Sequence, residues 1–222
     1  MLKVYVINLE RAQDRRESIS QQLAQQNISF EFYPAVDGRL DKSYAQTYYR
    51  NFSRLIRYAR PLSDSQIGGF ASHYKLWLKC IELNQPIVIL EDDIYLKENF
   101  AEKLEFCFTK ISKYHYLRFM GVFPRAKYEV EPGIECYIKT PTGAQGYMLD
   151  PVAAQKFIQF ANKLWIEPVD NYMDRFWLHG MRPYVLAPEI IYTPHLFESS
   201  IVNNSKPKKY LKLLEKFISY LI

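Results

Sequence analysis

Cysteine and histidine are both scarce in this sequence. Its 222 residues include three cysteines, Cys80, Cys107 and Cys136, which stand far apart and in no metal-binding spacing. A disulfide framework is therefore not expected, and the pattern is typical of reduced, mostly buried thiols in a cytosolic protein. The four histidines do not favour a phosphoesterase with two metal ions, because such a site usually needs several His or Asp ligands.

Long apolar runs are also missing. No stretch approaches the roughly 18 apolar residues that a membrane span requires. The opening residues, MLKVYVINLERAQDRR, have too short an apolar stretch for a signal peptide and continue into charge. We therefore expect a cytoplasmic protein. No clustered basic and aromatic motif occurs before residue 200, so a nucleic-acid partner is not expected.

Basic and aromatic residues are present in excess. Lys and Arg outnumber Asp and Glu by 29 to 24, a net charge of +5. This suits an anionic partner such as a nucleotide, a phosphorylated glycan or a membrane surface, although solubility alone would also explain it. Aromatic residues make up 16% of the chain. Their flat faces suit sugar rings, but most of them should belong to the core.

The order of predicted elements indicates an α/β fold. Residues 3–9 and 28–36 are predicted to be strands on either side of a helix at 14–26, which is a βαβ unit that opens a parallel sheet. Further elements are predicted, in chain order, as a helix from Ser63 or Asp64 to Leu83, a strand at 87–90, a helix at 99–112, a strand at 116–122, loops at 123–146, helices from Pro151 and at 169–178, and a strand at 184–192. Without repeats or a low-complexity linker, we predict one domain over residues 1–204, followed by a tail.

Three acidic residues follow an apolar run in PIVILEDDIY, residues 86–95. Ile87 to Leu90 is predicted to be a buried strand, with Glu91, Asp92 and Asp93 at its carboxyl end, where open α/β sheets bind ligands. Because alternate residues of an extended chain share a face, Glu91 and Asp93 are expected to point into one site and Asp92 away from it. Neighbouring carboxylates favour a hard cation, Mn²⁺ or Mg²⁺, that shares its shell with substrate phosphates. The alternative is a solvated acidic turn that caps the next helix.

Several segments resemble glycosyltransferase family 25, which contains bacterial lipooligosaccharide sugar transferases and relatives among the collagen galactosyltransferases. ILEDD looks like the acidic motif of that family. Other similar segments, in chain order, are VYVINLERAQDRR, YPAVDGR, SQIGGFASHYKLW, TGAQGYMLD and PVDNYMDRFW, and the match extends over residues 3–200. Two positions depart from the family pattern: Gln66 stands where Glu is usual, and Gly69 where Cys is usual.

The resemblance implies a GT-A-type fold, a nucleotide-binding α/β/α sandwich with a mostly parallel central sheet. It implies the transfer of a sugar, with galactose from UDP-galactose as the expected donor, to a lipooligosaccharide glycan with inversion at the anomeric carbon. Asp93, with help from Glu91 or Asp92, would hold Mn²⁺ or Mg²⁺ against the donor diphosphate. Inversion in one displacement also requires a general base that accepts the proton of the attacking hydroxyl.

Residues after the first two predicted strands are candidates for binding the nucleotide-sugar donor. Arg11, favoured over Arg15 and Arg16, can contact phosphate through two N–H groups, and a solvated helix start is the alternative. Asn8, in the same segment, is counted among the donor-binding residues. Asp37 follows the second strand and could hold uracil or ribose, or only shape its turn.

Ser72 and His73 are a polar pair inside a predicted helix, beside Gly68 and Gly69. The resemblance implies that both belong to the donor site, while a structural histidine is the alternative for His73. His195, after the last predicted strand, could complete the metal shell or be an ordinary loop residue.

Asp170 and Asp174 are four residues apart and share a helix face. Asp170 matches an aspartate of the family and is the first candidate for the general base. Trp165, Tyr172 and Trp177 flank it, and such aromatic side chains could stack on an acceptor sugar and raise the pKa of Asp170 by excluding water. Asp174 is the second candidate, although a surface acid is its simpler interpretation, and Glu198 is a third.

The tail, residues 205–222, has the pattern of a basic amphipathic helix. Residues 206–222 could contact the inner face of the inner membrane, where a lipid-linked oligosaccharide acceptor would be assembled, or pack on the domain or a partner subunit. Arg50, Arg54 and Arg57 form a second basic stripe, interpreted as a solvated face or as a contact for acceptor phosphates. A non-catalytic glycan- or membrane-binding module is the alternative function, but it would leave the acids at the strand end without a role.

Overall fold

The computed structural model describes residues 2–161 and 165–193. The strands are β1 (Lys3–Asn8), β2 (Glu31–Pro34), β3 (Ile87–Glu91), β4 (Tyr95–Leu96), β5 (Tyr116–Arg118), β6 (Lys127–Glu131), β7 (Ile134–Tyr137), β8 (Gly146–Leu149), β9 (Tyr184–Leu186) and β10 (Ile191–Tyr192). The helices are α1 (Gln13–Gln25), α2 (Ser43–Thr47), α3 (Asn51–Tyr58), α4 (Asp64–Leu83), α5 (Phe100–Tyr114), α6 (Pro151–Ala161), α7 (Val169–Met173) and α8 (Phe176–His179).

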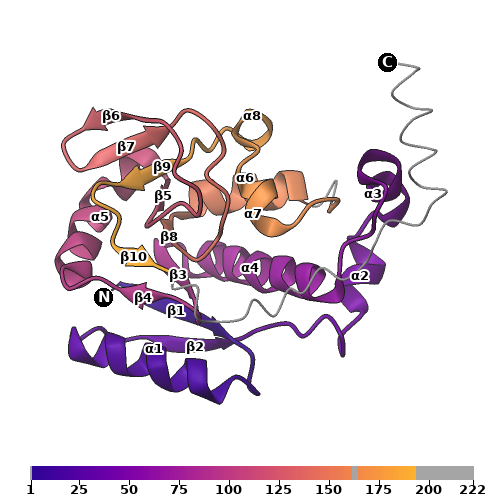
Figure 1. Ribbon diagram of the computed structural model, residues 1–222, viewed down its shortest axis with the longest axis horizontal. Coiled ribbons are helices and arrows are strands. Elements are labelled where there is room, and N and C mark those ends of the chain that lie inside the picture. Colours follow the sequence, from indigo (N-terminus) through magenta and orange to yellow (C-terminus); the bar gives the residue numbers. More distant parts are fainter. Residues whose placement is uncertain (1, 162–164, 194–222) are drawn as a thin grey trace.

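The central sheet has the strand order β2-β1-β3-β8-β5-β9-β7-β6 (Figure 1). β1 pairs in parallel with β2 and β3, which confirms the opening βαβ unit. β8 runs antiparallel to both β3 and β5, and β5 is parallel to β9. The sheet is therefore mixed, but β1, β2, β3, β5 and β9 all point their carboxyl ends to the same edge. Such an edge is the usual ligand site of an open α/β sheet.

Helices cover both faces of this sheet, so the α/β/α sandwich is confirmed. In β1, Val4 and Val6 belong to a core shared with α1 and α5, whereas Tyr5 and Ile7 belong to a core shared with α4 and α6. This alternation follows from the two-residue period of a strand, which sends successive side chains to opposite faces. Figure 1 shows α4 and α6 side by side over one face.

Local signals determine both ends of α4. The Ser63 hydroxyl accepts a hydrogen bond from the Gln66 amide, and the Gln66 side chain accepts one from the Ser63 amide, at 3.2 and 2.9 Å. This reciprocal capping box begins the helix where the sequence predicts it. Asn84 ends it in a left-handed conformation, with φ of 49°. Gln66 thus has a structural role that a glutamate would also perform.

Four predicted elements are wrong in detail, and one of them is the strand predicted at 116–122, which ends at Arg118. Residues 123–146, predicted as loops, contain the β6–β7 hairpin, which turns at Gly133 with φ of +86°. The hairpin is hard to recognise because β6 lies at the sheet edge with an exposed pattern instead of an apolar alternation. The helix predicted at 169–178 is broken into α7 and α8, and the strand at 184–192 is divided into β9 and β10.

The predicted solvated arginine stripe is also wrong at its centre. Arg54 is 3% exposed, and its guanidinium donates to the carbonyls of Arg60 and Ile166 at 3.0 Å each, whereas Arg50 and Arg57 are exposed. Arg54 therefore joins α3 to the segment before α7. The three cysteines are free and buried, as predicted.

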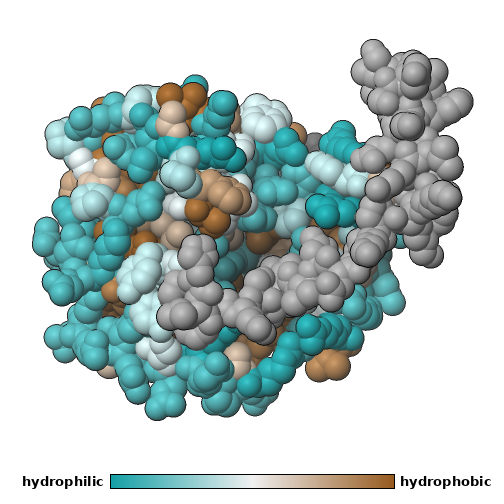
Figure 2. Space-filling view, in the orientation of Figure 1, coloured by the Kyte–Doolittle hydropathy of each residue, from teal (hydrophilic) through white to brown (hydrophobic). Residues whose placement is uncertain are grey.

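The surface of the described residues is mostly hydrophilic on the face shown in Figure 2, where hydrophobic colours form small separate patches. Within residues 2–161 and 165–193, no helix has the length and apolar character needed to cross a membrane. The tail predicted as an amphipathic helix, together with His195 and Glu198, lies outside the described residues. Its helix, and the domain boundary at residue 204, stay predictions.

Candidate functional site

A pocket of about 390 Å³ opens at the carboxyl ends of β1, β2 and β3. Its size is in the range usual for small-molecule sites. The described residues that line it are Ile7, Leu9, Arg11, Ala12, Arg15, Ala35, Val36, Asp37, Gly38, Arg39, Ser65, Gly69, Ser72, His73, Glu91, Asp92 and Asp93. Seven residues predicted for the site are therefore brought together: Arg11, Asp37, Ser72, His73, Glu91, Asp92 and Asp93.

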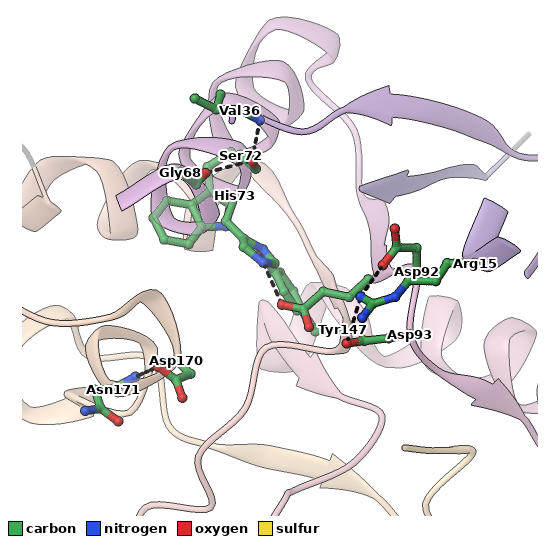
Figure 3. A network of polar contacts seen from close by, with 12 residues as sticks. Arg15, Val36, Gly68, Ser72, His73, Asp92, Asp93, Tyr147, Asp170 and Asn171 are labelled. Atoms are coloured by element: carbon green, nitrogen blue, oxygen red, sulfur yellow. Dashed lines mark hydrogen bonds and ion pairs between the residues drawn. The ribbon is translucent and has the colours of Figure 1, made fainter. Parts of the chain in front are cut away.

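All three acids of the ILEDD motif face this pocket. β3 ends at Glu91, so Asp92 and Asp93 lie in a bend and the strand alternation no longer applies to them. The expectation that Asp92 points away from the site is therefore wrong. Arg15, on α1, lies 3.4 Å from a carboxylate oxygen of both Asp92 and Asp93. Figure 3 shows these three side chains converging.

Asp93 is the least satisfied of the three acids. Its Oδ1 is buried and has no hydrogen-bond partner among the described residues. Burial, reinforced by the negative charge of Glu91 and opposed by Arg15, raises the pKa of Asp93 to about 7. Burial also raises the pKa of Asp92, against the opposing effect of its bonds with Asn8 and Arg15.

Asn8 orients Asp92 from the end of β1. It is 2% exposed, and its amide donates to Asp92 Oδ2 at 2.7 Å and to the Ala12 carbonyl at 3.2 Å. Its Oδ1 accepts a hydrogen bond from Arg16. Asn8 is not among the described residues that line the pocket. The geometry thus assigns it to holding the acidic loop, and its predicted contact with the donor stays a prediction.

His73 supports Glu91 from the side of α4. It is 1% exposed, with Nε2 3.3 Å from Glu91 Oε1 and Nδ1 2.8 Å from the Tyr147 hydroxyl. A carboxylate can only accept, so Nε2–H is the donor to Glu91, and in a neutral ring Nδ1 then accepts from the Tyr147 hydroxyl, whose oxygen accepts from Trp77 at 2.9 Å. Tyr147, which the sequence analysis did not single out, thus helps to fix the tautomer of His73.

Ser72 attaches the loop after β2 to α4. Its hydroxyl accepts from the Val36 amide and donates to the Gly68 carbonyl, both at 2.8 Å (Figure 3). The close approach depends on glycine, because a Cβ atom on Gly68 would lie 2.3 Å from the Val36 carbonyl oxygen. Gly69, by contrast, has open space where its Cβ would lie, and it lines the pocket.

Arg11 and Asp37 form an ion pair at the mouth of the pocket. Burial alone would raise the pKa of Asp37, but hydrogen bonds from the Arg39 amide and the Arg11 guanidinium lower it below its ordinary value. Arg11 is half-exposed. A ligand phosphate could therefore reach it without displacing a buried contact.

Asp170 lies on α7, separate from this group (Figure 3). Its Oδ1 accepts from the Asn171 amide at 2.8 Å. Burial, with a contribution from the negative charge of Glu91, raises the pKa of Asp170. The shift has the direction predicted from desolvation, but the aromatic surroundings differ from the prediction. Trp165 and Tyr172 are core residues, at 1% and 3% exposure, and of the three flanking aromatics only Trp177 is exposed.

Asp174 is buried and engaged with other residues instead of lying on the surface. Its Oδ1 forms an ion pair with Arg118 Nη2 at 3.1 Å, although the two atoms are not aligned for a hydrogen bond, and its Oδ2 accepts from the Thr142 amide at 2.8 Å. Arg118 also donates to the Thr142 carbonyl at 3.1 Å, so the pair holds Thr142 through both its backbone groups. Arg118 was not among the predicted site residues, although a charge between Leu117 and Phe119 inside the predicted strand 116–122 is a signal that it has a buried partner.

The acids fit a divalent cation shared with a ligand. The described residues contain no group of three or more His, Cys, Asp or Glu side chains arranged to hold a metal ion by themselves. However, Asp93 has a buried oxygen with no partner in the described part of the chain, and Glu91 lies close enough to raise the pKa of Asp93. Two carboxylates completed by substrate phosphates are a usual arrangement for Mg²⁺ and similar ions.

The fold and the pocket define an α/β protein with an acidic ligand site at the carboxyl edge of its sheet. The family model of glycosyltransferase family 25, described as "LPS biosynthesis protein", matches residues 1–173. This chain belongs to that family.

Two curated relatives and one solved structure illustrate the similarity. The chain is 24% identical over 220 residues to a zebrafish (Danio rerio) procollagen galactosyltransferase 1, covering 87% of this chain and 36% of the relative. It is 38% identical over 96 residues to the lipooligosaccharide biosynthesis protein lic2B of Haemophilus influenzae, covering 43% and 35%. The matches thus span about a third of the length of these relatives. A glycosyltransferase involved in glycosylation of the major capsid of PBCV-1 matches with a TM-score of 0.37 and 11% identity, over 72% of this chain and 67% of that one.

Proposed function

We propose that this chain is a metal-dependent, inverting glycosyltransferase that moves galactose from UDP-galactose to a glycan of a lipooligosaccharide acceptor. One observation carries the proposal: a pocket at the carboxyl edge of the sheet combines three acids with arginines from the first βα turn and helix. Family membership and the names of the relatives support sugar transfer, galactose and a lipooligosaccharide acceptor.

The basic groups at the mouth of the pocket would bind the donor. Arg11 would contact the diphosphate, and Arg15, already placed between Asp92 and Asp93, would keep those acids oriented. Asp37, whose lowered pKa keeps it ionised, would accept hydrogen bonds from the ribose or the uracil. Ser72 would contribute through the loop that it attaches to α4.

Asp93 and Glu91 are the residues that would hold Mn²⁺ or Mg²⁺. A bound divalent cation would neutralise the negative charge that the nucleoside diphosphate gains as the sugar leaves. The proposed contribution of His195 to the metal shell rests on the sequence alone.

Asp170 would act as the general base. An inverting transfer needs a proton acceptor on the face of the sugar opposite the leaving phosphate. Asp170 lies on another element than the acids of the pocket, and its raised pKa makes it a better proton acceptor than an exposed aspartate. Asp174 is the second candidate, but its engagement with Arg118 and the Thr142 amide favours a structural role.

The release of UDP from UDP-galactose tests the proposal. We expect Mn²⁺-dependent release that an added lipooligosaccharide acceptor stimulates and that excess chelator abolishes. A non-catalytic glycan- or membrane-binding module would release no UDP under any of these conditions. A phosphoesterase would instead cleave within the diphosphate, so its products would include galactose 1-phosphate.

A further inference from the structure

A second pocket, of about 460 Å³, lies between α3, the segment before α7, and helices α7 and α8. Among the described residues, it shares no lining residue with the pocket at the strand ends. The function proposed above does not use it. Its wall nevertheless combines an exposed aromatic side chain with two arginines, which is a combination suited to a particular kind of ligand.

The inner wall of this pocket is a pre-organised ion pair. The Glu167 carboxylate is 7% exposed and accepts from Arg175 Nε at 2.8 Å and from Arg175 Nη2 at 2.5 Å. The Tyr58 hydroxyl donates to the same carboxylate and accepts from Arg175 at 3.1 Å. A two-pronged bond of this kind holds the guanidinium plane in one orientation. Arg175 therefore has a fixed position before any ligand arrives.

Trp177 presents its indole ring at this pocket. It is 60% exposed, whereas Trp77 and Trp165 are 0% and 1% exposed. The guanidinium of Arg175 lies 5.1 Å from the Trp177 ring centroid, and the Phe176 ring packs edge-on at 5.2 Å. The indole is thus held in place while much of its surface stays open. An open aromatic face on a rigid support is suited to stacking against a sugar ring.

The charge balance of the pocket favours an anion. Arg57, in the last turn of α3, is exposed and adds a second cation to Arg175. Glu167 is the one carboxylate among the described residues that line the pocket, and Arg175 already neutralises it. The described residues that line the pocket therefore carry one net positive charge. Arginine at such a place can bind phosphate or carboxylate through two N–H groups.

We propose that this pocket is a subsite for a sugar ring that carries a phosphate or a carboxylate group. The ring would stack on Trp177. The anionic group would lie toward Arg57 and toward the side of the Arg175 guanidinium that does not bond Glu167. Lipid-linked and cell-surface glycans can supply either group, and the shared chemistry is an anionic sugar.

The subsite lies on the helix that also carries the proposed base. Asp170 and the pocket residue Tyr172 are two residues apart in the five-residue α7. Because residues two apart in a helix face different sides, the two sites lie on different sides of α7. A glycan of several sugars whose hydroxyl reaches Asp170 could extend past α7 and place a more distant, charged sugar unit in the second pocket. Only this identification of the ligand as the acceptor rests on the proposed function; the binding of an anionic sugar does not.

The three tryptophans make the test selective. Trp177 reports on the second pocket. Trp77 reports on the pocket at the strand ends, because it donates to the Tyr147 hydroxyl, which in turn bonds His73. The indole N–H signals of the ¹⁵N-labelled full chain are titrated with glucose 6-phosphate and galacturonate. Parallel titrations use glucose, galactose, inorganic phosphate and UDP.

We expect both charged sugars to shift the Trp177 signal in a saturable manner. Because a charge-assisted hydrogen bond contributes about 1.5–3 kcal/mol, the neutral sugars should bind at least ~10-fold more weakly. UDP should shift the Trp77 signal and leave the Trp177 signal unchanged. Inorganic phosphate that binds as tightly as glucose 6-phosphate would show a simple anion site and overturn the sugar subsite.

Two variants and a control locate the binding. Arg57→Gln should weaken the binding of charged sugars by at least ~10-fold, since it removes the cation that Glu167 does not neutralise. Trp177→Ala should weaken the binding of charged and neutral sugars alike. Because this variant lacks the reporter indole, its binding is measured by saturation-transfer NMR on the ligand signals. Arg50→Gln removes an exposed arginine outside the pocket and should change nothing.

Two results separate this inference from the proposed function. If UDP shifts Trp77 but no sugar shifts Trp177, the subsite is wrong and the donor pocket stands. If the charged sugars shift Trp177 but UDP-galactose is never turned over, the subsite stands and the proposed function is wrong.

Discussion

The carboxylate of Asp93 follows the end of β3, has a raised pKa, and has a buried oxygen with no hydrogen-bond partner among residues 2–161 and 165–193. Structural carboxylates usually have their hydrogen bonds satisfied, because an unsatisfied buried polar atom costs stability. Such an atom at the edge of a ligand pocket is therefore better explained by a ligand than by the fold.

Asp93→Asn should reduce transferase turnover by at least ~100-fold, because it keeps the side-chain volume but removes a charge that holds the cation. The melting temperature should stay the same or rise, since the change removes a buried charge next to Glu91. Turnover and thermal unfolding are measured together, with the exposed Glu102→Gln as the control. Full wild-type activity in excess chelator would contradict the metal role.

Asp170→Asn should separate binding from chemistry. Loss of the general base should lower turnover by at least ~10²-fold, because the amide cannot accept the proton of the attacking hydroxyl. Affinity for UDP-galactose and Mn²⁺, measured by calorimetry, should match that of the wild type. Loss of donor binding would make Asp170 a donor-site residue, and surviving turnover would make it structural and turn attention to Asp174.

The N-terminal part of helix α4 contributes to the shape of the pocket, in addition to His73. The capping box at Ser63 and Gln66 sets where the helix begins, and one to two turns further on Gly68, Gly69 and Ser72 contact the loop after β2 or line the pocket. The position of the helix start is therefore coupled to the shape of the site.

Ser63→Ala and Gln66→Glu should have opposite consequences for α4. Ser63→Ala removes the cap and should cost about 1 kcal/mol of unfolding free energy. Gln66→Glu keeps the acceptor and adds a negative charge near the helix N-terminus, so stability should be unchanged or rise by about 0.3–1 kcal/mol. Urea denaturation measures both changes. A large loss of turnover in Gln66→Glu, with normal stability, would show that Gln66 takes part in the chemistry.

The packing of α6, α7 and α8 encloses His179, whose ring is 2% exposed and lies against Phe157 and Tyr172. Nδ1 accepts from the Met181 amide at 3.1 Å, so the neutral ring is the form that fits. Burial is the main cause that lowers the pKa of His179 to about 4 from an ordinary 6.5.

This histidine should make the whole molecule less stable in acid. Between pH 6.5 and 4 the unfolded chain binds a proton that the folded chain does not, so stability falls as the pH falls through this window, by roughly 3 kcal/mol in total. His179→Gln keeps a donor and an acceptor but cannot titrate. Its unfolding free energy, from urea denaturation at pH 7 and pH 4.5, should depend less on pH than that of the wild type. Parallel pH profiles would contradict the role of His179.

Residues 206–222, outside the described residues, are predicted to bind a membrane surface. If residues 206–222 form the predicted basic amphipathic helix, the full-length chain should float with anionic vesicles better than a chain that ends at Asn204, because lysines are attracted to anionic lipids. Neutral phosphatidylcholine vesicles are the control. Equal flotation of the two chains would remove the membrane anchor.

The sequence alone was enough for the elements whose signals lie within a few residues of one another. The capping residues of α4, the proline that begins α6, and the apolar run of β3 followed by acids are all local patterns. Local hydrogen bonds and the strand period determine such features before any long-range contact forms. The pocket was also predictable in outline, because the acids, Arg11 and Asp37 each follow a strand of the same parallel group.

Only the tertiary structure decided which distant groups meet. The insertion of antiparallel β8 between β3 and β5 brings Tyr147 to His73, and Arg118 meets Asp174 across 56 positions of sequence. The burial of Arg54 and the exposure of Trp177 likewise depend on how α3, α7 and α8 pack. Sequence periodicity describes which side of an element is apolar. It does not describe which element covers that side, because this depends on the shape and volume of side chains far apart in the chain.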